Sequence, residues 1–477
     1  MMISKEKPEL SFFQIILPVF FLGVLIIFGM VIRPKIWGQP PFPLEIVFLL
    51  AAVFAIAEFM LLGFQWTDIQ NAFIQKLAKG FPAILILFAI GVIIGTWIIS
   101  GTIPMLIYYG IQLINPTYIY LLAFLIPIIF STLTGTSWGS IGTIGVVIIG
   151  VAGVIEANLG ITAGAIVGGA FFGDKLSPLS DTTNIAAMAT EVDLYDHIRS
   201  MMYTTMPSAI FASVIYFILG FTHPPTGSEL DTSQIAPTLE AISSMFNFNI
   251  FLLLPAAIVL IGSIRKMATL PTLLISSLSA CLLTGMFQPY SLSDIMTTIH
   301  RGFDSEMAYW VAGIPENINV LFTRGGLYEL NEAIIFSIMV FVFIGTIDLV
   351  DAMPKIVDRI FTFIKSKASL IVSSLFATAF TNAITSNQSA TSFIIGDAFG
   401  KRYDTLSVSR KVLSRSIEDY GTMFESLIPW HATTIFLTAT LSISYGEYWH
   451  WQFLSLINLV MAPTLAILGK GCFFNEE

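Results

Sequence analysis

Long runs of apolar residues alternate with short polar connectors along most of this chain of 477 residues. A run of about 20 apolar residues is long enough to cross the hydrocarbon core of a bilayer as a helix. The runs lie at 11–32, 42–63, 81–103, 117–132, 141–158, 161–190, 203–222, 247–264, 269–287, 331–352, 368–384, 420–441 and 450–468. They predict an all-α polytopic membrane protein with about 11 to 13 spans, two of them broken by polar residues.

The connectors are short, with two exceptions at 223–245 and 288–330. The second is expected to form either a partly helical cap or a plain solvated loop. Residues 66–79 place apolar and polar side chains on opposite sides, a pattern that predicts an amphipathic helix on the membrane surface. These boundaries predict four sections: N-terminal helices with the surface helix (1–80), two larger units (81–222 and 331–477), and connecting helices with the cap (223–330).

One apolar run turns abruptly polar at its middle. Residues 168–184 read GGAFFGDKLSPLSDTTN, in which acidic, hydroxyl and amide side chains surround Pro178. Proline removes a helix hydrogen-bond donor and disfavours helical geometry at Ser177. Carboxylates at bilayer depth are costly unless they line a cavity or find partners. The stretch therefore predicts a broken membrane helix arranged around a hard cation, which prefers oxygen ligands.

Composition narrows the classes of protein that remain. Hydrophobic residues make up 55% of the chain and charged residues 11%, and the net charge is −9. No basic patch suited to nucleic acid is present, and the two cysteines predict neither a disulfide framework nor a metal cluster. No nucleotide-binding or metalloprotease motif occurs. We therefore expect neither an enzyme nor a resident cofactor.

Parts of the chain repeat at an offset of about 250 residues. Gly95-Thr96, followed by Pro104, matches Gly345-Thr346, followed by Pro354. Further along, 130–132 matches 380–382, and 178–183 matches 429–434. Three matches in register predict that 81–222 and 331–477 are two copies of one structural unit.

Loop charges predict that the two copies are inverted. Residues 104–117 contain no Lys or Arg, whereas the corresponding loop holds Lys355, Arg359, Lys365 and Lys367. Residues 151–164 carry only Glu156, whereas their counterpart is rich in Lys and Arg over 401–415. Because positive loops stay on the cytoplasmic side, corresponding loops are expected on opposite faces. Inverted repeats with paired broken helices are the recurring plan of secondary transporters.

A second polar element precedes each broken helix. Residues 131–140 (STLTGTSWGS) interrupt two apolar segments, and 385–392 (TSNQSATS) stand at the matching place. Each predicts the tip of a re-entrant hairpin, although such residues also serve as packing contacts between membrane helices. A tip facing a broken helix provides half of a cation cage in each repeat.

The two cages are expected to differ. In the first, Asp181 is the principal candidate ligand, and Asp174 next to Lys175 is either a further ligand or half of a structural ion pair. In the second, His431 is either a proton carrier beside Glu425 or a hydrogen-bonded core residue. The candidate ligands of the first repeat are Asp181, Ser180, Thr182, Asn184, Asp174, Thr136 and Ser137, with Na⁺ held by Asp181, Ser180, Thr182 and Ser137. The candidates of the second repeat are Asn387, Ser389, Thr433, His431 and Glu425.

Residues 135–140 together with 168–184 resemble the NhaC family of bacterial Na⁺/H⁺ antiporters. The resemblance implies membership of the ion transporter superfamily, whose inverted repeats each hold a re-entrant hairpin and a broken helix. It also implies a transport domain that moves like an elevator beside a scaffold, a location in the bacterial cytoplasmic membrane, and often a homodimer.

Two transport hypotheses follow from these patterns. In the first, Na⁺ and H⁺ compete for one carboxylate, so that each ion releases the other and the protein exchanges them. In the second, the protein is an antiporter of the Na⁺-lactate/H⁺-malate type, with the anion at the positive ends of the half-helices. Lys175 is the only Lys or Arg inside the motifs, which favours the first hypothesis.

Overall fold

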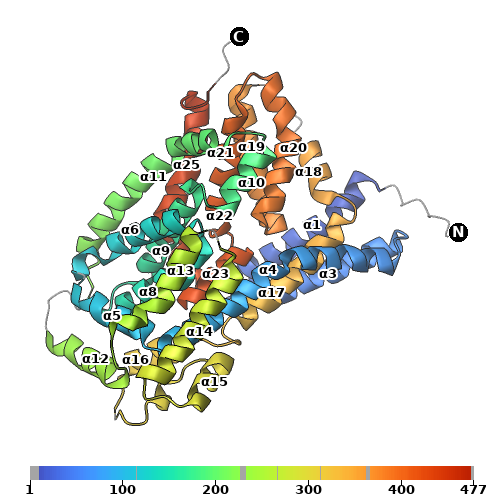
Figure 1. The fold of residues 1–477 in the computed structure, drawn as a ribbon. Helices are drawn as coiled ribbons and strands as arrows, with labels where there is room; N and C mark the ends of the chain where they lie inside the picture. The colour runs from blue at the N-terminus through green and yellow to red at the C-terminus, as the bar shows by residue number, and fades with distance from the viewer. Residues whose placement is uncertain are drawn as a thin grey trace.

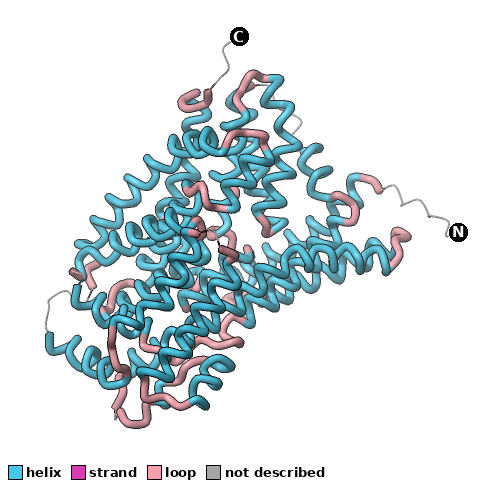
Figure 2. Tube along the Cα trace, in the orientation of Figure 1, coloured by secondary structure: helices cyan, strands magenta, loops and turns pink. Residues whose placement is uncertain are grey.

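The computed structural model describes residues 10–113, 115–225, 232–265, 267–311, 313–360 and 366–473. Across these residues the regular structure is helical, and the one isolated β-bridge, between Phe303 and Arg324, belongs to no sheet (Figure 2). By length and composition, ten helices of the described chain can cross a bilayer, or up to 12 with two bent pairs. The prediction of an all-helical, multi-pass protein is confirmed, and the ten to 12 candidate spans overlap the expected 11 to 13.

The helices follow one another in three groups. The first group is α1 (Phe12–Ile26), η1 (Ile27–Ile32), α2 (Arg33–Ile36), α3 (Leu44–Leu61), α4 (Trp66–Ile99), α5 (Thr102–Leu113), η2 (Pro116–Tyr118), α6 (Ile119–Thr134), α7 (Ser137–Ser140), η3 (Ile141–Gly145), α8 (Val146–Val154), α9 (Leu159–Leu176), α10 (Asp181–Ala189) and α11 (Leu194–Thr222). The second is α12 (Thr232–Met245), η5 (Ile250–Leu253), α13 (Leu254–Ile264), α14 (Thr269–Phe287), α15 (Leu292–Arg301), η6 (Ser305–Met307) and α16 (Glu316–Phe322). The third is α17 (Asn331–Asp348), α18 (Ala352–Ile360), α19 (Lys367–Thr385), α20 (Gln388–Thr405), α21 (Arg410–Tyr420), α22 (Thr422–Glu425), α23 (Ala432–Leu441), α24 (Tyr445–Tyr448), η7 (Trp449–Trp451) and α25 (Phe453–Leu468).

Helix α4 corrects one expectation. Residues 66–79 do not form a separate surface helix but are the first part of a single helix of 34 residues that continues through Pro82. One of their polar side chains, Lys76, forms an ion pair of 2.9 Å with Asp348 on α17, and Phe73 packs against Gly345 of the same helix. Other polar residues of this part, such as Asp68 and Gln75, are exposed. Part of the amphipathic pattern therefore reflects the interface with α17, and the boundary expected at residue 80 falls inside α4.

Helices α3, α4 and α17 pack together and run toward the side where α1 lies (Figure 1). Their contact surface is apolar, with buried residues such as Phe48, Phe336 and Phe343 in edge-to-face ring contacts. Such burial stabilises each large apolar side chain by about 2 kcal/mol relative to exposure in water, and less where lipid replaces water.

A second bundle contains the polar motifs. Helix α6 packs along α9, α11 packs on α25, and α21 packs between α19 and α11. Gly173 on α9 allows a close approach to α6, because a Cβ atom there would lie 2.4 Å from the backbone nitrogen of Thr132. Of the two forms expected for residues 288–330, the structure shows the partly helical one, with α15, η6 and α16. This section contacts α4 through a hydrogen bond from the Gly326 N–H to the Gly91 carbonyl.

Helix α21 departs from the sequence pattern. Residues 401–415 were expected to be a positively charged loop, but a helix begins at Arg410, and all of its residues from Val412 to Tyr420 are buried. Arg415 is 2% exposed. Its guanidinium donates to the carbonyls of Ser200 and Gly471, so at least one charge counted as a loop charge serves inside the protein.

Candidate functional site

Two helix–turn–helix elements place polar tips inside the second bundle. Helix α6 ends at Gly135, which has φ +70°, and Thr136 caps the N-terminus of α7 by accepting the Gly139 N–H at 3.2 Å. Gly135 leaves no room for a side chain, since a Cβ atom there would lie 2.6 Å from Leu179. The first tip therefore packs directly on the break between α9 and α10.

The second tip is built in the same way. Helix α19 ends at Ser386, which has φ +47°, and Asn387 caps α20 by accepting the Ala390 N–H at 2.8 Å. The Ser386 hydroxyl in turn accepts the Ala432 N–H at 2.8 Å. Each tip thus contacts the broken helix of its own half of the chain.

The first break is held open by side-chain hydrogen bonds to backbone atoms. Ser177 leaves the helix with extended geometry, and its hydroxyl donates to the Thr132 carbonyl at 2.9 Å. Ser180 then caps α10. Asn184 donates to the carbonyls of Pro178 and Ser180 at 3.0 and 2.6 Å, and its side chain is used in fixing the break.

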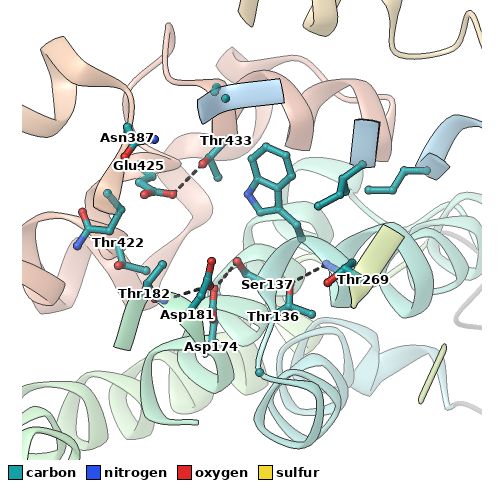
Figure 3. A pocket seen from close by; sticks show the side chains of 18 of the residues that line it. Thr136, Ser137, Asp174, Asp181, Thr182, Thr269, Asn387, Thr422, Glu425 and Thr433 are labelled. Atoms are coloured by element: carbon teal, nitrogen blue, oxygen red, sulfur yellow. Dashed lines mark hydrogen bonds between the residues drawn. The ribbon is translucent and has the colours of Figure 1, made fainter. Parts of the chain in front are cut away.

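The tips and breaks enclose a cavity of about 480 Å³ (Figure 3). Both halves of the chain contribute polar side chains to its wall. From the first half these include Thr136, Ser137, Asp174, Asp181 and Thr182; from the second half they include Asn387, Gln388, Thr422, Glu425, His431 and Thr433. Nine of the twelve candidate residues therefore meet at one cavity. The other three, Ser180, Asn184 and Ser389, are not among the described residues that line it.

The serine hydroxyls of the first site gather around Asp174. The carboxylate is 5% exposed and accepts the Ser137 hydroxyl at 2.6 Å and the Ser180 hydroxyl at 2.6 Å. The Ser180 hydroxyl lies 3.0 Å from that of Thr182. Asp181 is exposed toward the cavity, close enough to Asp174 for the two carboxylates to interact electrostatically. Asp174 is thus the buried centre of the oxygen cluster, and Asp181 lies at its cavity side.

Lys175 does not pair with Asp174. Its ammonium group forms a buried ion pair with Asp419 on α21. Asp419 also accepts Thr204 at 2.9 Å and Asn458 at 3.1 Å. The expected alternative of an Asp174–Lys175 structural pair is replaced by a pair between the two halves, and no Lys or Arg of the described chain forms an ion pair with Asp174.

The second site contains one carboxylate and a histidine with a different task. Glu425 accepts the Thr433 hydroxyl at 2.7 Å. His431 accepts the Thr433 N–H at Nδ1, at 3.1 Å, and so caps α23; its Nε2 lies 3.4 Å from the Asn382 amide oxygen. Because Nδ1 accepts a hydrogen bond, the ring is neutral and its one proton is on Nε2. This favours the core-residue interpretation of His431 over a proton carrier.

The donor set suits a hard monovalent cation. In the described chain no three His, Cys, Asp or Glu side chains are grouped to hold a metal ion. A cation here would be held by one or two carboxylates together with hydroxyl and carbonyl oxygens, which are poor ligands for transition metals.

Three residues near the cavity were not among the candidate ligands predicted from the sequence. Gln388 and Thr422 line it, and Glu418 lies behind it, fully buried. Gln388 follows directly on the second tip, so its position in the motif 385–392 was a usable signal. Glu418 was recognisable from the sequence only as one ionisable group of the second repeat, because a polar run with five charges in 410–419 resembles a solvated helix.

Comparison with known proteins agrees with this geometry. The model of the Na⁺/H⁺ antiporter family matches residues 169–470, more than half of the chain. A protein of Haemophilus influenzae described as an uncharacterized Na⁺/H⁺ antiporter is 38% identical over 90% of this chain and 91% of its own. The Na⁺/H⁺ antiporter NhaC of Alkalihalophilus pseudofirmus is 32% identical over 91% of both chains. The malate-2H⁺/Na⁺-lactate antiporter of Bacillus subtilis is 28% identical over the same shares. The chain belongs to the Na⁺/H⁺ antiporter family.

Proposed function

We propose that this protein is a secondary transporter that exchanges Na⁺ for H⁺ across the bacterial cytoplasmic membrane. The observation that carries the proposal is the buried Asp174 carboxylate with two serine hydroxyls at 2.6 Å, at the wall of a polar cavity between two broken helices. Membership of the family and the description of the NhaC relative as a Na⁺/H⁺ antiporter support the choice of ions. The protein is a transporter and not an enzyme.

The exchange follows from competition at one site. Asp174 binds Na⁺ together with the oxygens of Ser137, Ser180 and Thr182, and Asp181 adds a second negative charge from the cavity side. The serine hydroxyls that donate to Asp174 in this arrangement rotate to present their lone pairs to the cation. A proton on Asp174 removes the charge that holds Na⁺, so each ion releases the other.

The chain is proposed to consist of two inverted repeats with re-entrant hairpins. The order of elements supports this: α6, a left-handed turn residue, a capped helix, a helix, a break and α10 correspond to α19, a left-handed turn residue, a capped helix, a helix, a break and α23. Helices α4 and α17, which pack on each other, occupy matching places and are proposed as the scaffold. The bundle that contains the cavity moves against them like an elevator.

A second candidate function is carriage of a small carboxylate together with the ions. The cavity of about 480 Å³ is much larger than one Na⁺ ion. The N-termini of α7, α10, α20 and α23 are all capped by residues at the tips and breaks around it, and helix N-termini favour anions. Lys79 also lines the cavity. The malate/lactate relative makes this class of substrate worth testing.

Reconstitution into liposomes tests both candidates. Purified protein is incorporated with a pH-sensitive dye in the lumen, and an outward or inward Na⁺ gradient is imposed with and without malate or lactate. Na⁺/H⁺ exchange predicts a lumenal pH change driven by Na⁺ alone, abolished by Asp174→Asn and retained by Glu240→Gln, which changes an exposed carboxylate on α12. A pH change that requires malate or lactate would replace the first function by the second, and no change under any condition would refute both.

A further inference from the structure

Glu418 is a buried carboxyl group that the exchange described above does not use. It lies on α21 with 0% exposure. Neither of its two carboxyl oxygens has a hydrogen-bond partner among the described residues. Burying an ionised carboxylate without donors is prohibitively costly, whereas a protonated one is tolerated. Glu418 therefore carries a proton in this arrangement.

The charges around Glu418 are already committed to other groups. Lys175 is within electrostatic reach, but its ammonium group is paired with Asp419. Arg415 points to Asp419 at 3.9 Å and to the carbonyls of Ser200 and Gly471. The titratable or charged groups that face this region are Lys175 and Asp174 from α9, Asp181 from α10, His197 from α11, Tyr403 from α20, Arg415 and Asp419 from α21 itself, and Glu425 from α22, while α25 presents the amide of Asn458 and α19 the hydroxyl of Ser374. Among the described residues, no Lys or Arg forms an ion pair or a hydrogen bond with the Glu418 carboxyl group.

Two side chains connect Glu418 with the cavity. The Thr422 hydroxyl faces the Glu418 carboxyl without completing a hydrogen bond, and Thr422 also lines the cavity. Gln388 lines the cavity as well and donates to the carbonyl of Ile417, the residue before Glu418, at 3.1 Å. At Gly421 the helix breaks, and a Cβ atom there would lie 2.2 Å from the Gln388 amide. Thr422 and Gln388 therefore link the surroundings of Glu418 to the wall of the cavity.

We propose that Glu418 is a proton-binding group of the transporter, separate from the Na⁺ site, which releases its proton to the cavity past Thr422 when Na⁺ binds. Electrostatics provides the coupling, because Glu418 interacts with both Asp174 and Glu425. Where Asp174 is already ionised, Na⁺ neutralises its charge, and the weaker negative potential favours the ionised form of Glu418. The inference rests on the proposed Na⁺/H⁺ exchange and adds a second proton to it.

The test counts the protons released per Na⁺ bound. Purified protein in weakly buffered detergent solution is titrated with NaCl while a pH dye records proton release, at a series of pH values. The wild-type protein is expected to release more than one proton per Na⁺ within part of the range. Glu418→Gln, which mimics the protonated side chain, is expected to bind Na⁺ and release at most one, and Glu240→Gln is expected to match the wild type.

Infrared difference spectra on addition of Na⁺ give an independent readout. The C=O stretching band of protonated carboxyl groups is expected to decrease in the wild type by more than in Glu418→Gln. An unchanged proton count in the variant overturns the role of Glu418 and leaves the exchange intact. If the wild-type protein never releases more than one proton per Na⁺ bound, the role of Glu418 as a second proton-binding group is overturned as well. If the wild-type protein binds no Na⁺, the exchange itself is refuted.

Discussion

Asp174→Asn is the most direct perturbation of the cavity, because it removes one negative charge and keeps the size of the side chain. The amide oxygen can accept one of the two serine hydroxyls that now donate to the carboxylate, Ser137 and Ser180, and the amide nitrogen can donate to the other. The local packing is therefore retained. The variant is expected to fold and insert like the wild type, and its defect is expected in ion binding alone.

The size of the defect follows from the lost charge. A unit charge about 4 Å from a cation contributes about 4 kcal/mol at an effective dielectric constant of about 20. Since about 1.4 kcal/mol corresponds to a tenfold change in affinity, Na⁺ binding is expected to weaken by about 10³-fold. Ser137→Ala removes a neutral ligand and is expected to cost about 1 kcal/mol, or about fivefold. Comparing the loss of Na⁺ affinity in Asp174→Asn with that in Ser137→Ala shows how much of the binding depends on the negative charge and how much on a single neutral ligand.

Binding of radioactive ²²Na⁺ to purified protein in nanodiscs measures both values at alkaline pH, where protons do not compete. Glu240→Gln provides a matched change of charge far from the cavity. Size-exclusion profiles establish that each variant is folded. A Na⁺ affinity of Asp174→Asn within a few-fold of the wild type, together with loss of binding in Asp181→Asn, would refute the central role of Asp174 and return it to Asp181.

Three further predictions concern ion pairs and close packing away from the Asp174 carboxylate. Asp419→Asn leaves Lys175 buried without its partner and is expected to lower the unfolding free energy by about 3–5 kcal/mol. The double variant with Lys175→Met should recover most of this loss in denaturant titrations in bicelles. If it does not, the unpaired lysine is not the cause of the lower stability. Gly173→Val is expected to separate α9 from the α6 backbone, 2.4 Å from its Cβ position, and to weaken Na⁺ binding while a change to Ala weakens it less; equal affinities would contradict the close packing. Hydrogen bonds from Arg410 lower the pKa of Asp404. The pair therefore stabilises the protein fully above the ordinary Asp pKa of about 4, and this stabilisation is lost as the pH falls through the lowered pKa. If the melting temperature of Arg410→Ala depends on acid pH in the same way as that of the wild type, the pair does not contribute this stabilisation.

The sequence was sufficient to locate the turns and breaks that form the cavity. Glycine, proline and hydroxyl residues interrupt apolar runs at the first tip, the second tip and the break at Pro178, and the turns occur there, at Gly135 and Ser386. Local chemistry determines these features, because a residue with positive φ or a missing N–H acts within its own segment. That the hairpins are re-entrant remains a prediction.

Contacts between segments far apart in the chain could not be predicted from local sequence patterns. Nothing near Lys175 indicates that its partner is Asp419, and nothing near Asp174 indicates that it, and not Asp181, accepts Ser137. Residues 66–79 were predicted to lie on the membrane surface, because the pattern alone does not show whether a polar side chain such as Lys76 faces lipid headgroups or a protein partner such as Asp348. In each case the tertiary partner decides the role of the residue.

The ion pair between Lys175 and Asp419 also has a consequence for how the protein is made. The two residues are separated by 244 positions, so a ribosome adding 5–20 residues per second completes Asp419 about 10 to 50 s after Lys175. Until then α9 carries an unneutralised ammonium group, which is costly to release into lipid. Helix α9 must therefore remain beside the insertion machinery or other nascent helices until α21 arrives. A chain truncated before α21 lacks Asp419, so Lys175 on α9 has no partner, and such a chain is expected to be degraded by membrane proteases.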